Sequence, residues 1–362
     1  MDSVTCRCRA SVRFPPSAEP SGTNVDKRHE RGGASVRGDL DQLYRDLRPY
    51  AFAIAYRMLG SVSEAEDVVQ DVFLRLAQAD DDHISSHKAF VATVTTRLAI
   101  DQLRSARARR ENYAGPWLPE PLLEDGTHDV AAAAETADSL TMAVLVILET
   151  LTPPERAAFL LHDVFGYDYG EVATILAKTE ASCRQLASRA RRRVHDDKPR
   201  FEASREERDR LAGQFFAACQ GRDMDGLVGL LAADAVLYGD GGAKGTGINR
   251  PVYGPAGIAK MLDNWFRQGE RLGVQTELVT INGHPGAKFL DPQGRLVNVI
   301  SLDIADGAVQ TVRSIINPEK HAPLGPLSPI GRRSGAAQGT APGTAEGTAA
   351  TPLSPTAVRD AP

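Results

Sequence analysis

The stretch LTPPERAAFLLHDVFGYDYGEVATILAKTEASCRQLASRARRRV (151–194) decides the fold of the middle of the chain. Thr152 with Glu155, and Asp168 with Glu171, have the spacing of capping boxes, which mark helix starts. The pattern predicts a helix ending at Gly166, a short helix ending near Thr179, a tight turn, and a last helix over 180–194. Two short helices separated by a tight turn, the second one basic, are typical of a helix-turn-helix.

The last helix of this stretch has an apolar side and a basic side. Leu186 and Ala190 are expected to pack inward. Arginine and glutamine can bond base edges in the major groove, and serine and arginine can bond phosphates. The side chains expected to face DNA are Ser182, Arg184, Gln185, Ser188, Arg189 and Arg192. The alternative is an ordinary helical hairpin, but five arginines between 184 and 193 favour DNA binding.

An earlier block, residues 40–112, also has helical periodicity. Ser63 and Glu66 have capping-box spacing, so we expect a helix to start there. Its apolar residues recur at helical spacing and form a buried face: Ala65, Val68, Val69, Val72, Phe73 and Leu76. Its opposite face is acidic and contains an exposed leucine: Asp67, Gln70, Asp71 and Leu74. From periodicity alone, a solvated surface is the favoured explanation of this face.

A second helix of this block is expected over 88–110, and its end is crowded with arginine. The arginines are Arg97, Arg104, Arg107, Arg109 and Arg110. Arginine at this density suits contacts with phosphates. A solvated basic helix end is the alternative.

The composition changes several times along the chain. We expect an unstructured extension (1–38), a helical module (39–112), a linker (113–137), a second helical module (138–197), an α+β domain (205–320) and an unstructured tail (321–362). The β-rich runs lie at 278–283, 288–291, 296–304 and 309–316. The sequence thus predicts a multidomain protein with two all-α modules followed by an α+β domain.

Composition and charge exclude several classes of protein. The chain has 362 residues and a formal net charge of −5, so nucleic-acid contacts must come from local basic patches. No apolar run approaches the ~20 residues of a membrane span, and we expect a cytoplasmic protein. None of the four cysteines has the spacing of a zinc site, so neither a metal nor a cofactor is expected.

The order of these modules resembles the extracytoplasmic-function (ECF) branch of the sigma-70 family. SEAEDVVQDVFLRL (63–76) is similar to the core-binding helix of region 2, RLAIDQLRSARARR (97–110) to its end that reads the −10 element, and 151–194 to region 4. Two departures from the family pattern are Asp71, where glutamate is usual, and AFVATV (89–94), which lacks a tryptophan.

This resemblance implies a sigma factor, which binds core RNA polymerase and directs it to promoter DNA. Asp67, Gln70, Asp71 and Leu74 would contact the clamp coiled coil of the largest polymerase subunit, and the flap would be a further contact. The helix over 88–110 would open and read the −10 element. The helix over 180–194 would read the −35 element.

Three short motifs narrow the subgroup. WLPEP (117–121), DGGAK (240–244) and NPEKH (317–321) resemble signatures of ECF sigma factors with a fused SnoaL-like domain, a cone with the fold of nuclear transport factor 2 (NTF2). Ala243 replaces the usual glycine and His321 the usual leucine. The residues expected to join the domains and regulate the protein are Trp117, Leu118, Pro119, Asp240, Gly241, Gly242, Lys244, Asn317, Pro318 and Lys320.

The resemblance implies that the fused domain regulates the sigma modules in place of a separate anti-sigma factor, and that the protein is not an enzyme. SnoaL-like cones also include enzymes, and the candidate pocket residues would be Asp234, Tyr238, Asp240, Tyr253, Trp265 and His284. Sensing of an unknown small molecule in the same pocket is a further alternative. A DNA-binding regulator that acts without polymerase would not need the acidic face of the helix over 63–76.

Overall fold

The computed structural model gives the conformation of residues 32–80, 84–110, 113, 115–123, 141–197, 203–243, 245, 247–248 and 250–331. Within these ranges, the side chains of 32–39, 106–110 and 196–197 are not described. The chain divides into two compact units, Met1–Arg48 and Pro49–Pro362. The expected functional residues all lie in the second unit.

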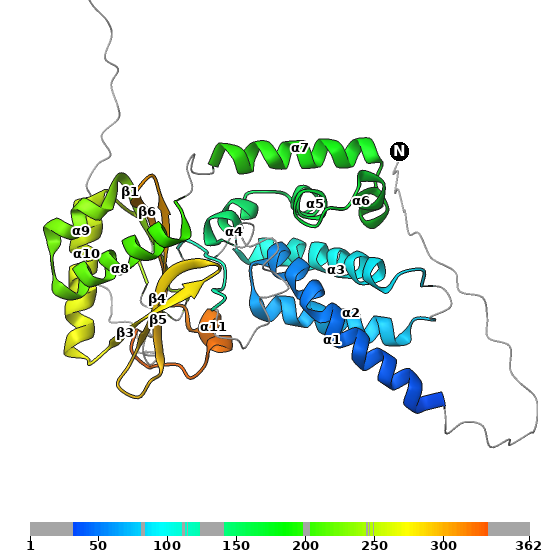
Figure 1. Ribbon diagram of the computed structural model, residues 1–362, viewed down its shortest axis with the longest axis horizontal. Helices are drawn as coiled ribbons and strands as arrows, with labels where there is room; N and C mark the ends of the chain where they lie inside the picture. The colour runs from blue at the N-terminus through cyan, green and yellow to red at the C-terminus, as the bar shows by residue number, and fades with distance from the viewer. Residues whose placement is uncertain are drawn as a thin grey trace, which may run out of the picture. The chain divides into compact units, whose positions relative to one another are not determined.

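The first helical module consists of α1 (Gly32–Leu59), α2 (Val62–Gln78) and α3 (His87–Arg110) (Figure 1). All six residues predicted for the apolar face of α2 are buried. The predicted start at Ser63 is wrong, because the N-cap is Ser61, whose side chain accepts a hydrogen bond from the backbone N–H of Glu64. The sequence SVSEAE contains two overlapping S-x-x-E motifs, and Gly60 ends α1 with a φ of +66°, which selects the first of them.

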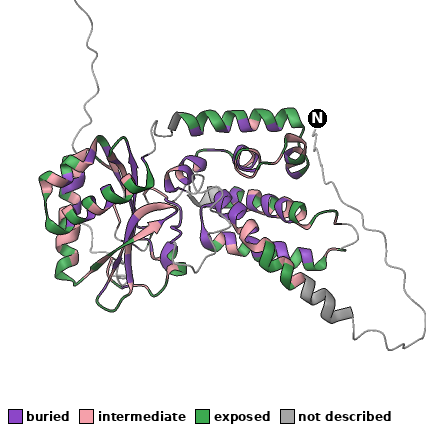
Figure 2. Cartoon of the chain, in the orientation of Figure 1, coloured by how far each residue is buried: buried purple, intermediate pink, exposed green. Residues whose placement is uncertain are grey.

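The second helical module consists of α4 (Met142–Glu149), α5 (Pro153–Phe159), the π-helical segment η3 (Leu160–Val164), α6 (Tyr169–Leu176) and α7 (Glu180–Asp197). Both predicted capping boxes, at Thr152 and Asp168, are confirmed. Helix α6 ends at Leu176, before the predicted Thr179, because Ala177 adopts a left-handed conformation that starts the turn. Figure 2 shows that α7 is exposed along most of its length.

The core of this second module joins three helices. Its buried residues are Ala158, Leu161, Val172, Ile175, Cys183 and Ala187. Ala190 on α7 is buried as predicted, and Leu186 is partly buried and packs against this core. The helix-turn-helix is therefore a packed unit in which α6 and α7 are held by α5.

The C-terminal domain contains α8 (Arg205–Gly221), α9 (Met224–Leu230), α10 (Pro255–Arg271) and six described strands. The strands are β1 (Leu231–Asp240), β2 (Val252–Tyr253), β3 (Gln275–Ile281), β4 (His284–Leu290), β5 (Leu296–Ala305) and β6 (Ala308–Ile315). They form one sheet in the order β2-β1-β6-β5-β4-β3, with β1 and β6 parallel and the other described neighbours antiparallel. The helices and the sheet share one apolar core, which includes Phe215, Phe216, Leu262, Ile300 and Val312.

Several segments differ from the expectation. Helix α1 begins at Gly32, within the extension that we expected to be unstructured, and the described chain continues through α11 (Pro318–His321) and η4 (Ala322–Leu324) to residue 331. The four β-rich runs correspond to β3–β6, whereas β1 and β2 were not predicted. No described helix is long and apolar enough to cross a membrane.

Candidate functional site

An extended segment, residues 115–123, which we call the linker strip, lies between the first helical module and the C-terminal domain. Its residues 118–123 are all buried. The backbone N–H of Glu120 donates to the carbonyl of Gly60 (2.8 Å), and the backbone N–H of Asn282 donates to the carbonyl of Leu122 (2.9 Å). Leu123 also forms a β-bridge with Ile281, at the end of β3. The linker strip is thus hydrogen-bonded both to the first helical module and to the C-terminal domain.

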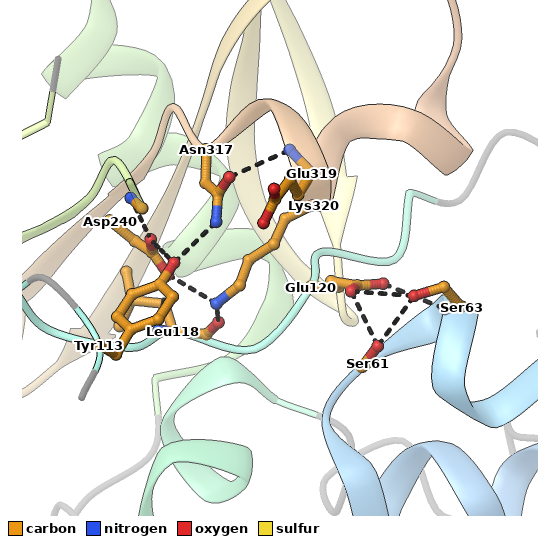
Figure 3. Close-up of polar contacts among 10 residues, drawn as sticks. Ser61, Ser63, Tyr113, Leu118, Glu120, Asp240, Asn317, Glu319 and Lys320 are labelled. Carbon is orange, nitrogen blue, oxygen red and sulfur yellow. Dashed lines mark hydrogen bonds and ion pairs between the residues drawn. The ribbon is translucent and has the colours of Figure 1, made fainter. Parts of the chain in front are cut away.

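The side chain of Glu120 caps the N-terminus of α2, an arrangement that we call the Glu120 cap (Figure 3). One carboxylate oxygen accepts from the backbone N–H of Val62 (2.6 Å) and of Ser63 (3.2 Å), and the other accepts from the Ser61 hydroxyl (2.8 Å). A carboxylate at a helix N-terminus satisfies N–H groups that have no partner within the helix and is favoured by the helix dipole. Burial raises the pKa of Glu120, and these hydrogen bonds oppose the rise.

A second polar group, the Asp240 cluster, consists of Tyr113, Leu118, Asp240, Asn317 and Lys320 (Figure 3). The Lys320 ammonium lies 2.6 Å from the Asp240 carboxylate and also donates to the Leu118 carbonyl. Asp240 accepts from the backbone N–H of Leu118 (2.9 Å) and from the Tyr113 hydroxyl. Asn317 donates to the Tyr113 hydroxyl (2.7 Å). The cluster therefore ties the linker to β1 and to the segment after β6.

The charged pair in this cluster is almost completely buried, with 6% of the Lys320 side chain and none of the Asp240 side chain exposed. A buried pair is tolerated when its remaining donors and acceptors are satisfied, and here the backbone of Leu118 supplies one of each. The Lys320 ammonium also lies 4.1 Å from the centroid of the Trp117 ring, within reach of a cation–π interaction. Burial and the nearby Asp240 carboxylate raise the pKa of Tyr113, so its hydroxyl remains a donor.

At two positions of the DGGAK loop, close contacts leave no space for a side chain and therefore require glycine. A Cβ on Gly241 would lie 2.4 Å from the backbone nitrogen of Gly247. A Cβ on Gly242, which has a φ of +57°, would lie 2.6 Å from the side-chain nitrogen of Asn317. Lys244 lies outside the described residues. The ammonium group that forms an ion pair with Asp240 is that of Lys320.

The remaining motif residues lie around these contacts. Asn317 is the N-cap of α11 and accepts from the backbone N–H of Glu319 (3.0 Å), and Pro318 occupies the first turn of that helix. Pro119 is buried, and Trp117 packs against Gly60, where an added Cβ would lie 2.9 Å from its ring. The structure thus brings together nine of the ten residues expected to regulate the protein, all except Lys244.

Tyr56 and Asn282 form a further junction that was not predicted. The Tyr56 hydroxyl donates to the carbonyl of Glu120 (2.6 Å) and accepts from the Asn282 amide (2.8 Å). The side-chain oxygen Oδ1 of Asn282 accepts a hydrogen bond from the backbone N–H of Leu122 (3.1 Å). Tyr113 and Glu120 were also missed. The available signal for Glu120 was its place within the WLPEP motif (117–121).

The residues expected to bind core polymerase lie on the free face of α2. Asp67, Gln70 and Asp71 are exposed. Leu74 is 60% exposed. The linker strip contacts the N-terminal end of this helix and leaves this face open.

The residues expected to read the −10 element are only partly described. The Arg97 guanidinium donates to the carbonyls of Ile175 (2.9 Å) and Thr174 (3.1 Å), at the C-terminus of α6. Arg104 is exposed and pairs with Asp101 (3.2 Å). The side chains of Arg107, Arg109 and Arg110 lie outside the described residues. In this arrangement, the Arg97 guanidinium is hydrogen-bonded to the helix-turn-helix.

The six residues expected to read the −35 element are all exposed on α7: Ser182, Arg184, Gln185, Ser188, Arg189 and Arg192. Arg184 pairs with Glu180 (2.8 Å) one turn earlier and lies over the Tyr169 ring. These contacts are at the surface and hold the guanidinium weakly. The face of α7 is therefore accessible to DNA.

Further contacts join the two helical modules. The Tyr50 and Tyr167 hydroxyls are hydrogen-bonded, and the fully buried Arg156 donates to the carbonyl of Met58 (2.6 Å). Together with Arg97, they hold the helix-turn-helix against α1 and α3.

Comparisons with known proteins agree with this architecture. Residues 43–109 match the model of Sigma-70 region 2, and residues 141–194 match that of Sigma-70, region 4. Together with a relative named as an ECF RNA polymerase sigma factor, which is 35% identical over 287 residues, these matches show that the protein belongs to the ECF RNA polymerase sigma factors and has the function of a sigma factor.

Its relatives include two sigma factors of Mycobacterium tuberculosis. The ECF RNA polymerase sigma factor SigJ is 35% identical over 287 residues, which cover 76% of this chain and 91% of SigJ. The probable ECF RNA polymerase sigma factor SigI is 29% identical over 298 residues, which cover 80% of this chain and 97% of SigI. The crystal structure of SigJ superposes with a TM-score of 0.64 at 33% identity and covers 78% of this chain and 98% of that one. The predicted fold class, two all-α sigma modules followed by an α+β domain, is confirmed.

Proposed function

We propose that the C-terminal domain restrains the sigma modules by holding the linker between them. The observation that carries the proposal is the position of the linker strip, whose backbone is bonded to Gly60 on one side and to Asn282 on the other. A sigma factor must place its two modules on promoter elements that are separated along the DNA. A linker fixed along 113–123 limits that separation, because the Asp240 cluster and the Glu120 cap hold both of its faces.

The contacts of Arg97 support an inhibitory direction. Its guanidinium binds two carbonyls of α6, so the first module must leave the helix-turn-helix before this arginine can reach the −10 element. Since the linker joins the two modules, a domain that fixes the linker also favours the arrangement in which Arg97 is occupied.

The residue roles in this proposal follow the ECF sigma pattern. The exposed face of α2 (Asp67, Gln70, Asp71, Leu74) binds the clamp coiled coil of the largest polymerase subunit, and the flap provides a further contact. The exposed face of α7 reads the −35 element, and the basic end of α3 reads the −10 element. The expected modules at 39–112, 138–197 and 205–320, with the linker at 113–137, carry these roles, and α1 extends the first of them to Gly32.

We further propose that the C-terminal domain is regulatory and has no catalytic activity. Of the six residues considered for catalysis, only Trp265 is among the described residues that line the cavity of this domain. Asp240 is bound by the linker, and Asp234 and Tyr253 are exposed. Acid–base catalysis needs a titratable side chain within reach of the substrate, and the described lining offers only Glu270, at the edge of the cavity.

The test is promoter-specific transcription by core polymerase with the full-length protein, comparing wild type with Lys320→Met. This change removes the ammonium and keeps the apolar stem, while Lys260→Met removes an exposed lysine of α10 and serves as the control. We expect more transcript with Lys320→Met and no change with Lys260→Met. Less transcript would show that the domain holds an active arrangement. An unchanged yield with a folded variant would refute regulation through the Asp240 cluster.

A further inference from the structure

A cavity of about 380 Å³ lies between the C-terminal half of α10 and the sheet. Its apolar wall contains Trp265 and Phe266 from α10, Phe289 from β4, and Val297 and Ile300 from β5. This volume lies within the range of about 300–1,000 Å³ that is typical of small-molecule sites. The Phe266 and Phe289 rings meet edge to face, with centroids 5.6 Å apart, and leave room for a further ring on the same wall.

The cavity contains one polar pair within this apolar wall. The Asn298 amide nitrogen donates to the Ser314 hydroxyl (2.9 Å), and this hydroxyl donates back to the Asn298 amide oxygen (3.2 Å); the two residues lie on neighbouring strands and both line the cavity. One amide N–H and lone pairs on both oxygens are not used by these two bonds, so the pair can also bind one polar group of a ligand. Among the described lining residues, the only ionisable side chain is that of Glu270, which is exposed. A charged ligand would therefore lose its hydration without a partner, which favours a neutral one.

The cavity shares two backbone segments with the Asp240 cluster. Ile316 lines the cavity, its N–H donates to the carbonyl of Asp240 (2.8 Å), and the next residue is Asn317 of the cluster. Gly247 also lines the cavity and closes the loop that begins at Asp240, where it packs against Gly241. A molecule in the cavity thus contacts both segments that position Asp240 and Asn317.

From these observations we propose that the cavity binds a small neutral aromatic molecule with one hydroxyl, carbonyl or amine group, and that this ligand stabilises the Asp240 cluster. The cavity exists while the cluster is formed, so a ligand that fits it binds this arrangement in preference to one in which the linker is released. The ligand would keep the linker bound to the C-terminal domain. This second part rests on the proposed regulatory function.

Binding is tested with N-phenyl-1-naphthylamine, a neutral fluorescent aromatic amine, titrated into the full-length protein. We expect a saturable rise in fluorescence at one probe per chain. Ile300→Trp, which fills the cavity, should abolish the rise, and Leu278→Ala, on the exposed edge strand β3, should not affect it. Because Ile300→Trp can perturb folding, Ser314→Ala is the second variant and should weaken binding about two- to ten-fold through the lost hydrogen bond.

Coupling is tested by the same titration with Lys320→Met. Because linkage is reciprocal, breaking the Asp240 cluster should weaken probe binding about five-fold or more, and Lys260→Met should leave it unchanged. The site would be refuted if the wild type showed no saturable binding. It would also be refuted if the probe bound Ile300→Trp and Ser314→Ala as tightly as it binds the wild type. Binding that is blocked by Ile300→Trp and insensitive to Lys320→Met would refute the coupling. Since the titration contains no polymerase, these results are independent of the transcription test of the regulatory function.

Discussion

The carboxylate of Glu120 accepts a 2.6 Å hydrogen bond from the backbone N–H of Val62, the first residue of α2. A residue of the linker thus caps a helix that begins 58 positions earlier in the chain. Release of the linker strip would leave the N–H groups of Val62 and Ser63 without this acceptor. The linker and the start of α2 are therefore energetically coupled.

Glu120→Ala should lower the free energy of unfolding by about 1–3 kcal/mol, because it leaves buried donors at the start of α2 without an acceptor. Chemical denaturation of the full-length protein, followed by circular dichroism, measures this loss. Glu206→Ala, at an exposed position in the first turn of α8, is the control. Equal stability of the Glu120→Ala variant and the wild type would show that solvent replaces the cap without cost.

The raised pKa of Glu120 also predicts a pH dependence. At pH values below 4.5, its ordinary pKa, the carboxyl is protonated in both the folded and the unfolded state. As the pH rises through the raised pKa, the folded state must hold a buried charge, and the stabilising contribution of this group is lost. The stability of wild type relative to Glu120→Gln should therefore decrease as the pH rises from 4.5 to the raised pKa. Denaturation midpoints of both proteins over this pH range test the sign.

A double-mutant cycle should show strong coupling between Lys320 and Asp240. Lys320→Met alone leaves a buried carboxylate without its cation and should cost about 3–5 kcal/mol of unfolding free energy. Combined with Asp240→Asn, the loss should be smaller than the sum of the two single changes. Additive losses, measured by denaturation, would mean that the two groups act independently.

Reversing the charge of α2 should prevent binding to core polymerase. The double change Asp67→Lys and Asp71→Lys alters two exposed side chains and should leave the melting temperature nearly unchanged. We expect a loss of at least about ten-fold in affinity for the core enzyme, consistent with the loss of charged interface contacts. A pull-down with purified core polymerase measures it, with Glu206→Lys as the control. Retained affinity would argue for a regulator that acts without polymerase.

Arg184→Ala and Gln185→Ala should each cost about 1–3 kcal/mol in binding to the preferred −35 sequence and much less on random DNA. Arg191→Ala is a matched control on the same helix, because the Arg191 guanidinium is held by Asp163 and Tyr169. Binding curves on both DNA sequences separate base recognition from phosphate contacts. An equal loss on both sequences would assign these residues to the backbone.

Local spacing was sufficient to predict the helices and their buried faces. The capping boxes at Thr152 and Asp168 and the apolar face of α2 depend on residues three or four positions apart, and these predictions are confirmed. Even here, two overlapping S-x-x-E motifs misplaced the N-cap of α2 by two residues, at Ser63 in place of Ser61. The choice between them depended on the conformation of Gly60, which a spacing argument does not include.

The sequence motifs located the junction of the domains but did not show its chemistry. Resemblance identified Asp240, Lys244 and Lys320 without saying which of them pair, and the structure pairs Lys320 with Asp240. Glu120, Tyr113 and Asn282 act through partners that are 58 to 226 positions away. Such pairings depend on the parallel contact of β1 with β6 and on the path of the linker, which no local pattern encodes.

The Asp240 cluster also has a consequence for protein synthesis. Lys320 follows Leu118, whose carbonyl it binds, by 202 residues. At about 5–20 residues per second, a ribosome adds this lysine roughly 10–40 s after the linker. Throughout that interval, the nascent chain contains the region 2 helices and the linker strip without the cation that completes the cluster. Each new molecule therefore passes through a period in which its sigma modules are synthesised and the Asp240 cluster is incomplete.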